Sequence, residues 1–130
     1  MKFIPWKTLG SKVLIKYRKW DYVEDEVELP SGKQINFQYI KSDGAAVIVP
    51  VDKDGNLLVM KEYRYFLDEA SLEFPAGLIE DGLSPEETAH KELAEEAGLQ
   101  AERIDYLGKS LMGAGSIKGF DHIFLATGLS

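Results

Sequence analysis

Residues 77–99 read GLIEDGLSPEETAHKELAEEAGL, a loop followed by one acidic helix. The Ser84 hydroxyl can accept a hydrogen bond from the amide of Glu87, and the Glu87 carboxylate can accept one from the amide of Ser84. Pro85 stands at the first helical position, where an amide would have no partner within the helix. Gly98 is typical of a helix end. The stretch therefore predicts a helix that starts after Ser84 and ends before Gly98.

The predicted helix has an apolar stripe bordered by acids. At 100° per residue, Ala89, Leu93 and Ala97 share one face. Three carboxylates lie along the edge of that face: Glu92, Glu95 and Glu96. Like charges three or four residues apart destabilise a helix by roughly 0.2–0.5 kcal/mol per pair, and acids in a last turn oppose the helix dipole. The pattern predicts a bound cation, whereas the plainer interpretation is a solvated charged face.

The acidity of the whole chain is concentrated in this stretch. The formal net charge is −7, and residues 80–96 hold seven acids against one lysine. Since the remainder is close to neutral, the charge indicates cation binding at one place rather than a basic partner. The sequence has no basic patch that would predict binding to duplex nucleic acid.

Residues 77–99 resemble the Nudix box, whose pattern is G, five residues, E, seven residues, R-E, an aliphatic residue, any residue, E-E, any residue, G and an aliphatic residue. Seven positions match: Gly77, Glu92, Leu93, Glu95, Glu96, Gly98 and Leu99. Two positions depart, because Leu83 stands where the pattern has Glu and Lys91 stands where it has Arg.

The flanking segments resemble the Nudix branch that hydrolyses ADP-ribose and other nucleoside diphosphate sugars. They are residues 62–64 (EYR), 73–77 (EFPAG) and 115–129. The resemblance implies an α/β (α+β) fold, a Nudix α/β/α sandwich with a mixed sheet. It also implies an N-terminal β subdomain, residues 1–43, that precedes the core domain of residues 44–130 and forms a homodimer.

In that branch another strand and a helix follow the segment that resembles 122–129, so we expect the C-terminal part of the fold to be missing from these 130 residues. A Glu in that region often activates the attacking water in the family. We therefore expect slow hydrolysis, with Glu95 and Asp121 as the remaining candidates for the base.

The resemblance also implies a Mg²⁺-dependent hydrolase with catalytic residues Glu92, Glu95 and Glu96. Glu92 and Glu96 would be the main metal ligands, Glu95 a further ligand or water bridge, and the Ala76 carbonyl a backbone ligand. Oxygen ligands suit Mg²⁺, and Mn²⁺ can substitute because its ligand preferences overlap. The sequence resembles no Ser-His-Asp or Cys-His nucleophile, which favours direct attack by water.

Arg64 and Glu73 are the candidate substrate-binding residues. A guanidinium fork can hold phosphate or stack on a base, although an ion pair of Arg64 with Glu62 or Asp68 is an equal alternative. Four aromatic residues could form a base-stacking platform or belong to the core: Tyr17, Trp20, Phe37 and Tyr39. We expect His90 to be exposed and His122 to be a structural residue.

Length and composition favour a cytoplasmic enzyme or binding protein. The chain has 130 residues and no cysteine, which excludes disulfides and thiolate metal sites. It has no apolar run of about 18 residues and no signal-peptide pattern at its start, so we expect no membrane association.

The strand pattern predicts a small antiparallel sheet over residues 12–41, with strands over 12–22, 22–29 and 35–39 and a junction at 41–44. Residues 45–51 and 57–65 predict a hairpin around Asp54-Gly55, with Pro50 at an edge or bulge. Further strands are expected at 72–74, 104–112 and 122–126.

Two function classes fit these observations. The first is a Mg²⁺-dependent hydrolase that splits a nucleoside diphosphate sugar into a nucleoside monophosphate and a sugar phosphate. The second is a catalytically weak Nudix-like domain that binds nucleotide without turning it over. Magnesium-dependent turnover separates the two.

Overall fold

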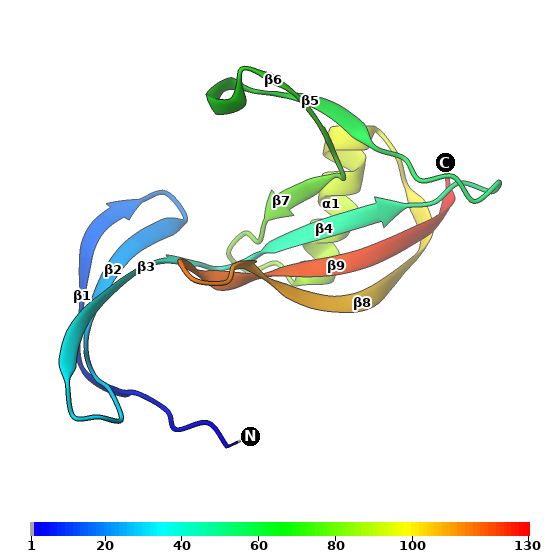
Figure 1. Ribbon diagram of the computed structural model, residues 1–130. Helices are drawn as coiled ribbons and strands as arrows, with labels where there is room; N and C mark the ends of the chain where they lie inside the picture. The colour runs from blue at the N-terminus through cyan, green and yellow to red at the C-terminus, as the bar shows by residue number, and fades with distance from the viewer. Residues whose placement is uncertain (1) are drawn as a thin grey trace. The chain divides into compact units, whose positions relative to one another are not determined.

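The computed structural model describes residues 2–130, which form two compact units (Figure 1). The first unit contains the chain up to Asp43 together with Leu111–Gly119, and the second contains Gly44–Ser110 and Phe120–Ser130. Strands β8 (Ala101–Gly113) and β9 (Ile117–Leu129) each contribute to both units. The sequence predicts a division after residue 43 but does not predict that 111–119 belongs with the N-terminal part.

The first unit is an antiparallel sheet of β1 (Lys7–Tyr17), β2 (Trp20–Glu28) and β3 (Gln34–Ser42). The last residues of β3 also pair in parallel with the start of β9. Val23 and Val27 of the central strand are buried. The small N-terminal antiparallel sheet expected from the sequence is therefore present.

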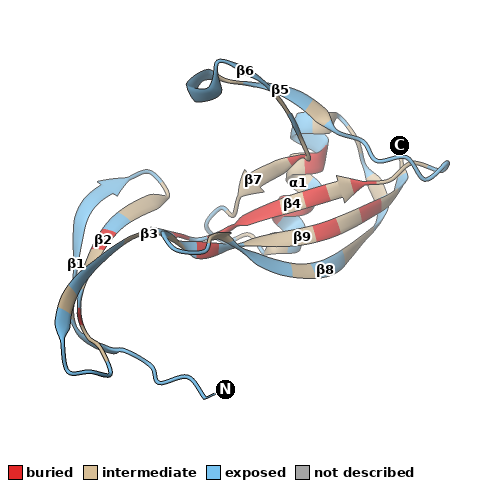
Figure 2. Ribbon diagram, in the orientation of Figure 1, coloured by how far each residue is buried: buried red, intermediate tan, exposed pale blue. Residues whose placement is uncertain are grey.

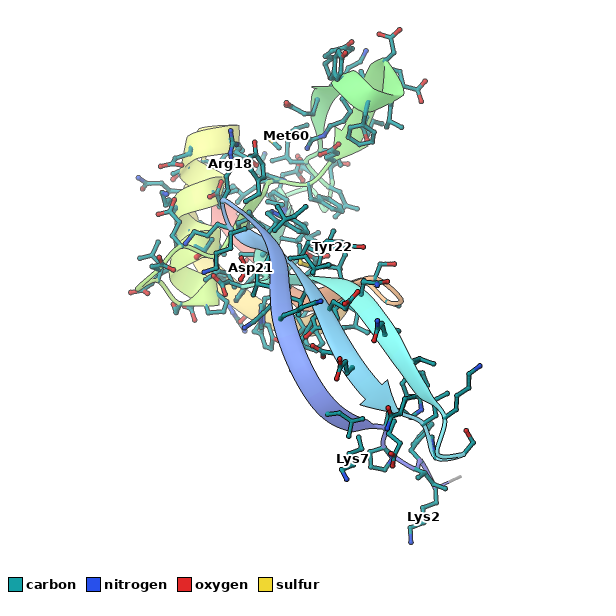
Figure 3. All side chains as sticks on the ribbon, turned by 90° about the vertical axis from the view of Figure 1, so that its left-hand side faces the viewer. Lys2, Lys7, Arg18, Asp21, Tyr22 and Met60 are labelled. Carbon is teal, nitrogen blue, oxygen red and sulfur yellow. The ribbon has the colours of Figure 1, made fainter. Side chains whose placement is uncertain are left out.

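Strand β1 begins and ends earlier than its sequence pattern predicts. The expected strand over residues 12–22 is wrong, because Arg18 adopts a left-handed conformation (φ 53°) and turns the chain into β2. Figure 3 shows Lys7 at the start of β1 and Arg18 at the opposite end of this hairpin. Among residues 2–130, β1 pairs with β2 alone and is thus an edge strand.

In the second unit, β4 (Ala45–Pro50) lies between β7 (Ala76–Leu78), which is antiparallel to it, and β9, which is parallel to it. Strand β8 pairs with β9. Helix α1 (Pro85–Ala97) packs on β4 and β7. Figure 2 shows the buried residues gathered on β4, β9 and α1. The buried core consists of Ala46, Ile48, Ala89, Leu93, Phe124 and Ala126.

Helix α1 has the start and end that the sequence predicts. The Glu87 amide donates to Ser84 Oγ at 3.1 Å, and the Ser84 amide donates to Glu87 Oε2 at 2.7 Å. Gly98 is left-handed (φ 65°), and its amide donates to the carbonyl of Ala94. The mixed α/β fold is confirmed, and within residues 2–130 it has one α-helical layer.

The predicted hairpin of residues 45–51 and 57–65 forms only next to its turn, and the predicted ladder between the two segments is wrong. The turn at Gly55 forms (φ 85°), but beyond it the two segments share only a bridge between Val51 and Leu57 and one further hydrogen bond. An apolar strand such as β4 gains most from a central position, and β7 and β9 occupy its two sides. Pro50 consequently ends a central strand, opposite Ala126, and does not lie on an edge.

Residues 60–73 form a separate two-stranded ribbon. Strand β5 (Met60–Arg64) leads through the short 3-10 helix η1 (Tyr65–Leu67) into β6 (Glu69–Glu73), and the two strands are antiparallel. The ribbon ends where residues 74–75 lead into β7, so its last residue, Glu73, lies three residues before Ala76.

Candidate functional site

The centre of the candidate site is the contact between Glu92 of α1 and Gly77 of β7. A Cβ atom on Gly77 would lie 2.2 Å from the Glu92 carboxylate carbon and 2.2 Å from Oε1, far inside contact distance. Only a residue without a side chain therefore lets this carboxylate rest against the strand. The glycine at the start of the motif has a steric role that spacing alone does not reveal.

Glu96 is fixed on the neighbouring residue of the same strand. The Ala76 amide donates a hydrogen bond to Glu96 Oε2 at 2.9 Å. Because Glu92 and Glu96 are four residues apart on α1, they lie on one helical face one turn apart. The structure thus brings two of the three predicted acids to consecutive residues of β7, while the third, Glu95, has Lys91 as its ion-pair partner at 3.9 Å.

The electrostatics of Glu92 reflect burial and crowding by like charges. Burial raises the pKa of its carboxyl, and the negative charges of Glu96 and Glu95 raise it further, while Lys91 acts in the opposite direction. A carboxylate that is desolvated and surrounded by carboxylates is stabilised by a cation. The arrangement accordingly fits a positively charged ligand better than a solvated helix face.

Lys91 is joined to the loop before the helix. Its Nζ atom lies 2.5 Å from Glu80 Oε1 and 3.9 Å from Glu95 Oε2. The pKa of Lys91 is raised first by the hydrogen bond to Glu80. Sequence reasoning did not identify this pair. The one available signal is that Glu80 and Lys91 carry opposite charges on either side of the helix start.

Arg64 and Glu73 form a two-point ion pair. Arg64 Nε donates to Glu73 Oε1 at 2.8 Å, and the second guanidinium nitrogen donates to Oε2. The pair raises the pKa of Arg64 and lowers that of Glu73, and the charge of Glu96 also contributes to the shift at Arg64. The two predicted substrate-binding residues are therefore in contact and within electrostatic reach of the helix acids.

The alternative partners considered for Arg64 are not its hydrogen-bond partners. Asp68 instead accepts a hydrogen bond from the Tyr63 hydroxyl at 2.9 Å. Glu62 contributes only a longer-range charge effect to the pKa of Arg64. The guanidinium thus points its fork at Glu73, the residue that begins the EFPAG segment.

The donor set fits a hard divalent cation. The candidate side-chain ligands are the carboxylate oxygens of Glu92, Glu95 and Glu96, and Mg²⁺ and Mn²⁺ prefer oxygen ligands. Among residues 2–130, no three His, Asp or Glu side chains converge into a ready-made metal cluster. Glu96 uses one carboxylate oxygen, Oε2, to accept from the Ala76 amide, and its second oxygen remains available to a cation.

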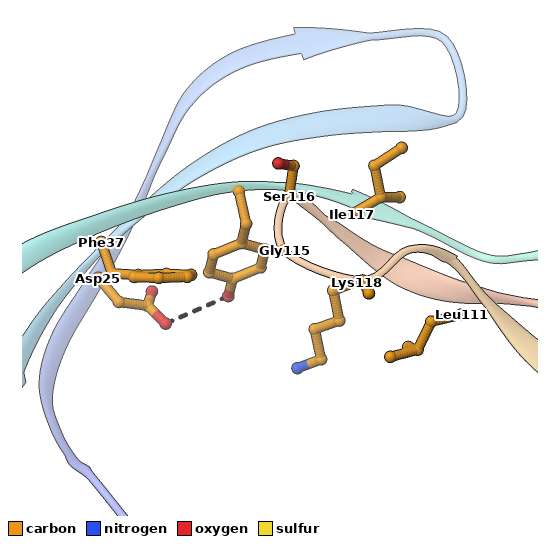
Figure 4. Close-up of a pocket in the computed structure, with 9 residues that line it drawn as sticks. Asp25, Phe37, Leu111, Gly115, Ser116, Ile117 and Lys118 are labelled. Atoms are coloured by element: carbon orange, nitrogen blue, oxygen red, sulfur yellow. Dashed lines mark hydrogen bonds between the residues drawn. The ribbon is translucent and has the colours of Figure 1, made fainter.

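The first unit contains a separate cavity of about 360 Å³ (Figure 4). Phe37 and Tyr39 line one side, with ring centroids 6.2 Å apart, and the Tyr39 hydroxyl donates to Asp25 Oδ2 at 3.2 Å. Leu111 and residues 114–118, including Lys118, line the rest. Two of the four aromatic residues considered for base stacking thus line a cavity; Tyr17 and Trp20 do not line it.

Neither histidine has a contact with Glu92, Glu95 or Glu96 in the described residues. His90 is exposed. His122 is half-buried on β9, where its Nδ1 lies 3.2 Å from the Tyr106 hydroxyl. Both positions agree with the expectation that His90 is a surface residue and His122 a structural one.

Comparison with known proteins identifies relatives over the whole chain. The NUDIX domain family matches residues 41–127. An ADP-ribose pyrophosphatase of Bacillus subtilis is 32% identical over 130 residues, which cover all of this chain and 70% of that protein. An ADP-ribose pyrophosphatase of Mycobacterium tuberculosis is 32% identical over 125 residues, which cover 95% of this chain and 60% of that protein.

The fold has a solved counterpart as well. The crystal structure of an ADP compounds hydrolase superimposes with a TM-score of 0.86 at 25% identity, covering all of this chain and 71% of that one. Within the described part of the chain, no helix has the length and apolar character needed to cross a membrane. Together with the glycine-backed acids of α1, these matches show that the chain belongs to the Nudix hydrolase family and is related to its ADP-ribose pyrophosphatases.

Proposed function

We propose that this chain is a Mg²⁺-dependent pyrophosphohydrolase. It splits the diphosphate of ADP-ribose or a related nucleoside diphosphate sugar and releases a nucleoside monophosphate and a sugar phosphate. The observation that supports this most strongly is the fixation of Glu92 and Glu96 against Gly77 and Ala76, with the Arg64 fork within electrostatic reach.

The helix acids and one carbonyl would hold the metal. Glu92 and Glu96 are the proposed main ligands, Glu95 a further ligand or water bridge, and the Ala76 carbonyl the backbone ligand. When bound, Mg²⁺ neutralises charge on the diphosphate and lowers the pKa of a coordinated water. Mn²⁺ is the expected substitute. All three acids act as catalytic residues in this proposal because they touch the reacting centre through the ion.

Arg64 is proposed to bind the diphosphate. Its guanidinium is always charged and offers a planar fork that matches phosphate oxygens. Glu73 accepts from Nε and one terminal nitrogen along one edge of the guanidinium, which orients Arg64 and leaves the remaining N–H groups for phosphate oxygens. Glu73 accordingly serves substrate binding by positioning Arg64.

The cavity of the first unit is, by itself, a candidate binding site for a planar ring such as a nucleobase. Aromatic rings such as those of Phe37 and Tyr39 can stack on a base, and the Asp25 carboxylate and the Lys118 ammonium offer polar contacts. This assignment concerns the first unit alone.

A binding domain without turnover is the second candidate. The specific observation that favours it is the pair of departures from the Nudix box, Leu83 and Lys91, since the first removes an acid and the second removes a guanidinium. Both candidates predict nucleotide binding, and they differ in whether metal produces turnover.

The test is a substrate screen with and without metal. The purified chain is incubated with ADP-ribose, GDP-mannose and a UDP-sugar, in Mg²⁺ and in excess chelator, and products are separated by ion-exchange chromatography. We expect a nucleoside monophosphate and a sugar phosphate in Mg²⁺ only. Nucleotide binding without products in Mg²⁺ would support the second candidate, and absence of both binding and products would contradict each of them.

A further inference from the structure

Lys91 is the one lysine or arginine among the seven acids of residues 80–96. Its ammonium lies 2.5 Å from Glu80 and 3.9 Å from Glu95, so Glu80 is its direct partner and Glu95 is at the outer limit of an ion pair. Lys91 also immediately precedes Glu92 in the chain. The Lys91 ammonium can form an ion pair with Glu80 or with the acids of α1. An ion pair with the acids of α1 would lower their affinity for any other cation.

Glu80 is presented by a loop that is fixed at several points. The Ile79 amide donates to the Gly44 carbonyl at 3.0 Å, the Leu83 amide donates to the Glu80 carbonyl at 3.1 Å, and the capping box holds Ser84. The loop of residues 79–83 is therefore tied to the sheet at its start, closed by a turn in its middle and tied to the helix at its end. Glu80 offers its carboxylate from a rigid base.

We propose that Glu80 is a positioning residue that keeps the Lys91 ammonium from closing from 3.9 Å onto Glu95 in a direct hydrogen bond, so that the helix carboxylates stay available to a divalent cation. This inference rests on the proposed function, because it concerns the same metal. Glu80 itself is not a proposed metal ligand.

The physical reason is competition for one flexible cation. Lys91 and Glu95 are four residues apart on α1, a spacing at which opposite charges pair on a helix surface. A lysine is a point charge on a flexible stem, so it turns to whichever carboxylate is available unless another acid holds it. If Glu80 is removed, the ammonium can shorten its 3.9 Å separation from Glu95 to a direct hydrogen bond, and a metal must then displace it.

The test is a double-mutant cycle read out by metal affinity. Mg²⁺ and Mn²⁺ binding is measured by titration calorimetry for the wild type, Glu80→Gln, Lys91→Gln and the double variant. We expect Glu80→Gln to weaken binding about three- to fivefold, the size of effect that an exposed ion pair supports. In the Lys91→Gln background, the same change should have little effect, because no ammonium remains to be released.

Two further variants separate positioning from charge. Glu86→Gln removes the same charge from the exposed first turn of α1 without touching Lys91, and it should change affinity less than Glu80→Gln does. Glu80→Asp keeps a carboxylate and should restore part of the affinity. The Glu80 side chain is 52% exposed, so these changes leave the core intact.

The outcomes distinguish this inference from the function on which it rests. An equal effect of Glu80→Gln in both backgrounds, or one no larger than that of Glu86→Gln, would overturn the positioning role while leaving the metal site in place. Absence of Mg²⁺ and Mn²⁺ binding by the wild type would overturn the proposed function itself.

Discussion

Gly77 determines how closely the Glu92 carboxylate can approach β7, and replacing Gly77 with alanine tests this directly. The added Cβ would lie 2.2 Å from the Glu92 carboxylate, so Glu92 must move away from the strand. We expect Gly77→Ala to weaken Mg²⁺ affinity about 10- to 100-fold, the range found when the support of a metal ligand is removed. The measurement is titration calorimetry.

Gly10→Ala is the matched control for that substitution. Its added Cβ would meet Glu26 at 3.7 Å, an ordinary contact, on strand β1. It should leave metal affinity unchanged. If the two variants bind metal equally well, the close approach of Glu92 to the strand is irrelevant to the site.

Glu92→Gln should separate stability from function. Burial and neighbouring acids raise the pKa of Glu92, so its ionised form is disfavoured in the folded chain, and this carboxylate lowers stability as pH rises through that pKa. A neutral glutamine of similar shape should therefore raise the melting temperature in metal-free buffer at pH 7 and also abolish the stabilisation by added Mg²⁺. A lower melting temperature without metal would show that Glu92 is a structural residue.

For single residues, the sequence identifies the acids of α1 but not the ion pairs that surround them. The spacing of Glu92, Glu95 and Glu96 follows from helical periodicity and is visible without a structure. The ion pair Arg64–Glu73 joins the two strands of the ribbon, and the ion pair Lys91–Glu80 joins α1 to the loop before it. Their formation depends on how those segments bend, which residue spacing does not specify.

Helix α1 is the element whose boundaries the sequence predicts best, since its cap, first turn and terminal glycine each satisfy a local rule. Local rules do not predict which strands pair. The run of residues 45–50 reads as a strand of a hairpin, yet its ladder partners come from residues 76–78 and 121–126. Pairing over such distances is decided by burial of the Ala46–Ile48 face of β4 in the core and by the helix α1 that packs on this strand.

The capping box predicts a pH dependence of stability. The hydrogen bond from the Ser84 amide lowers the pKa of Glu87. A lowered pKa means that this contribution to stability is complete above the unfolded value of about 4.3 and is lost as pH falls through the lower folded value. Glu87→Gln should therefore lose less stability than the wild type between pH 7 and pH 3, measured by urea unfolding. Parallel losses in the two proteins would show that the cap carboxylate makes no such contribution.

At the scale of the whole molecule, we propose that the first unit mediates a homodimer. Strand β1 is an edge strand, and its successive residues Val13, Leu14 and Ile15, which lie at an irregularity in the pairing with β2, are all exposed and apolar. We expect light scattering at micromolar concentration to give twice the mass of 14.5 kDa. Ile15→Lys should shift the mass toward the monomer. A monomeric wild type would refute the dimer.

The central claim is that the acids of α1 make this chain a metal-dependent hydrolase of a nucleoside diphosphate sugar. The most direct measurement is the rate of nucleoside monophosphate release from ADP-ribose in saturating Mg²⁺, compared between the wild type, Glu96→Gln and Glu86→Gln. Both substitutions remove one negative charge from α1, but only Glu96 contacts the Ala76 amide of β7. The account predicts release that stops in chelator, falls at least about tenfold in Glu96→Gln and is unchanged in Glu86→Gln. Equal rates in the three proteins, or release that continues in chelator, would contradict it.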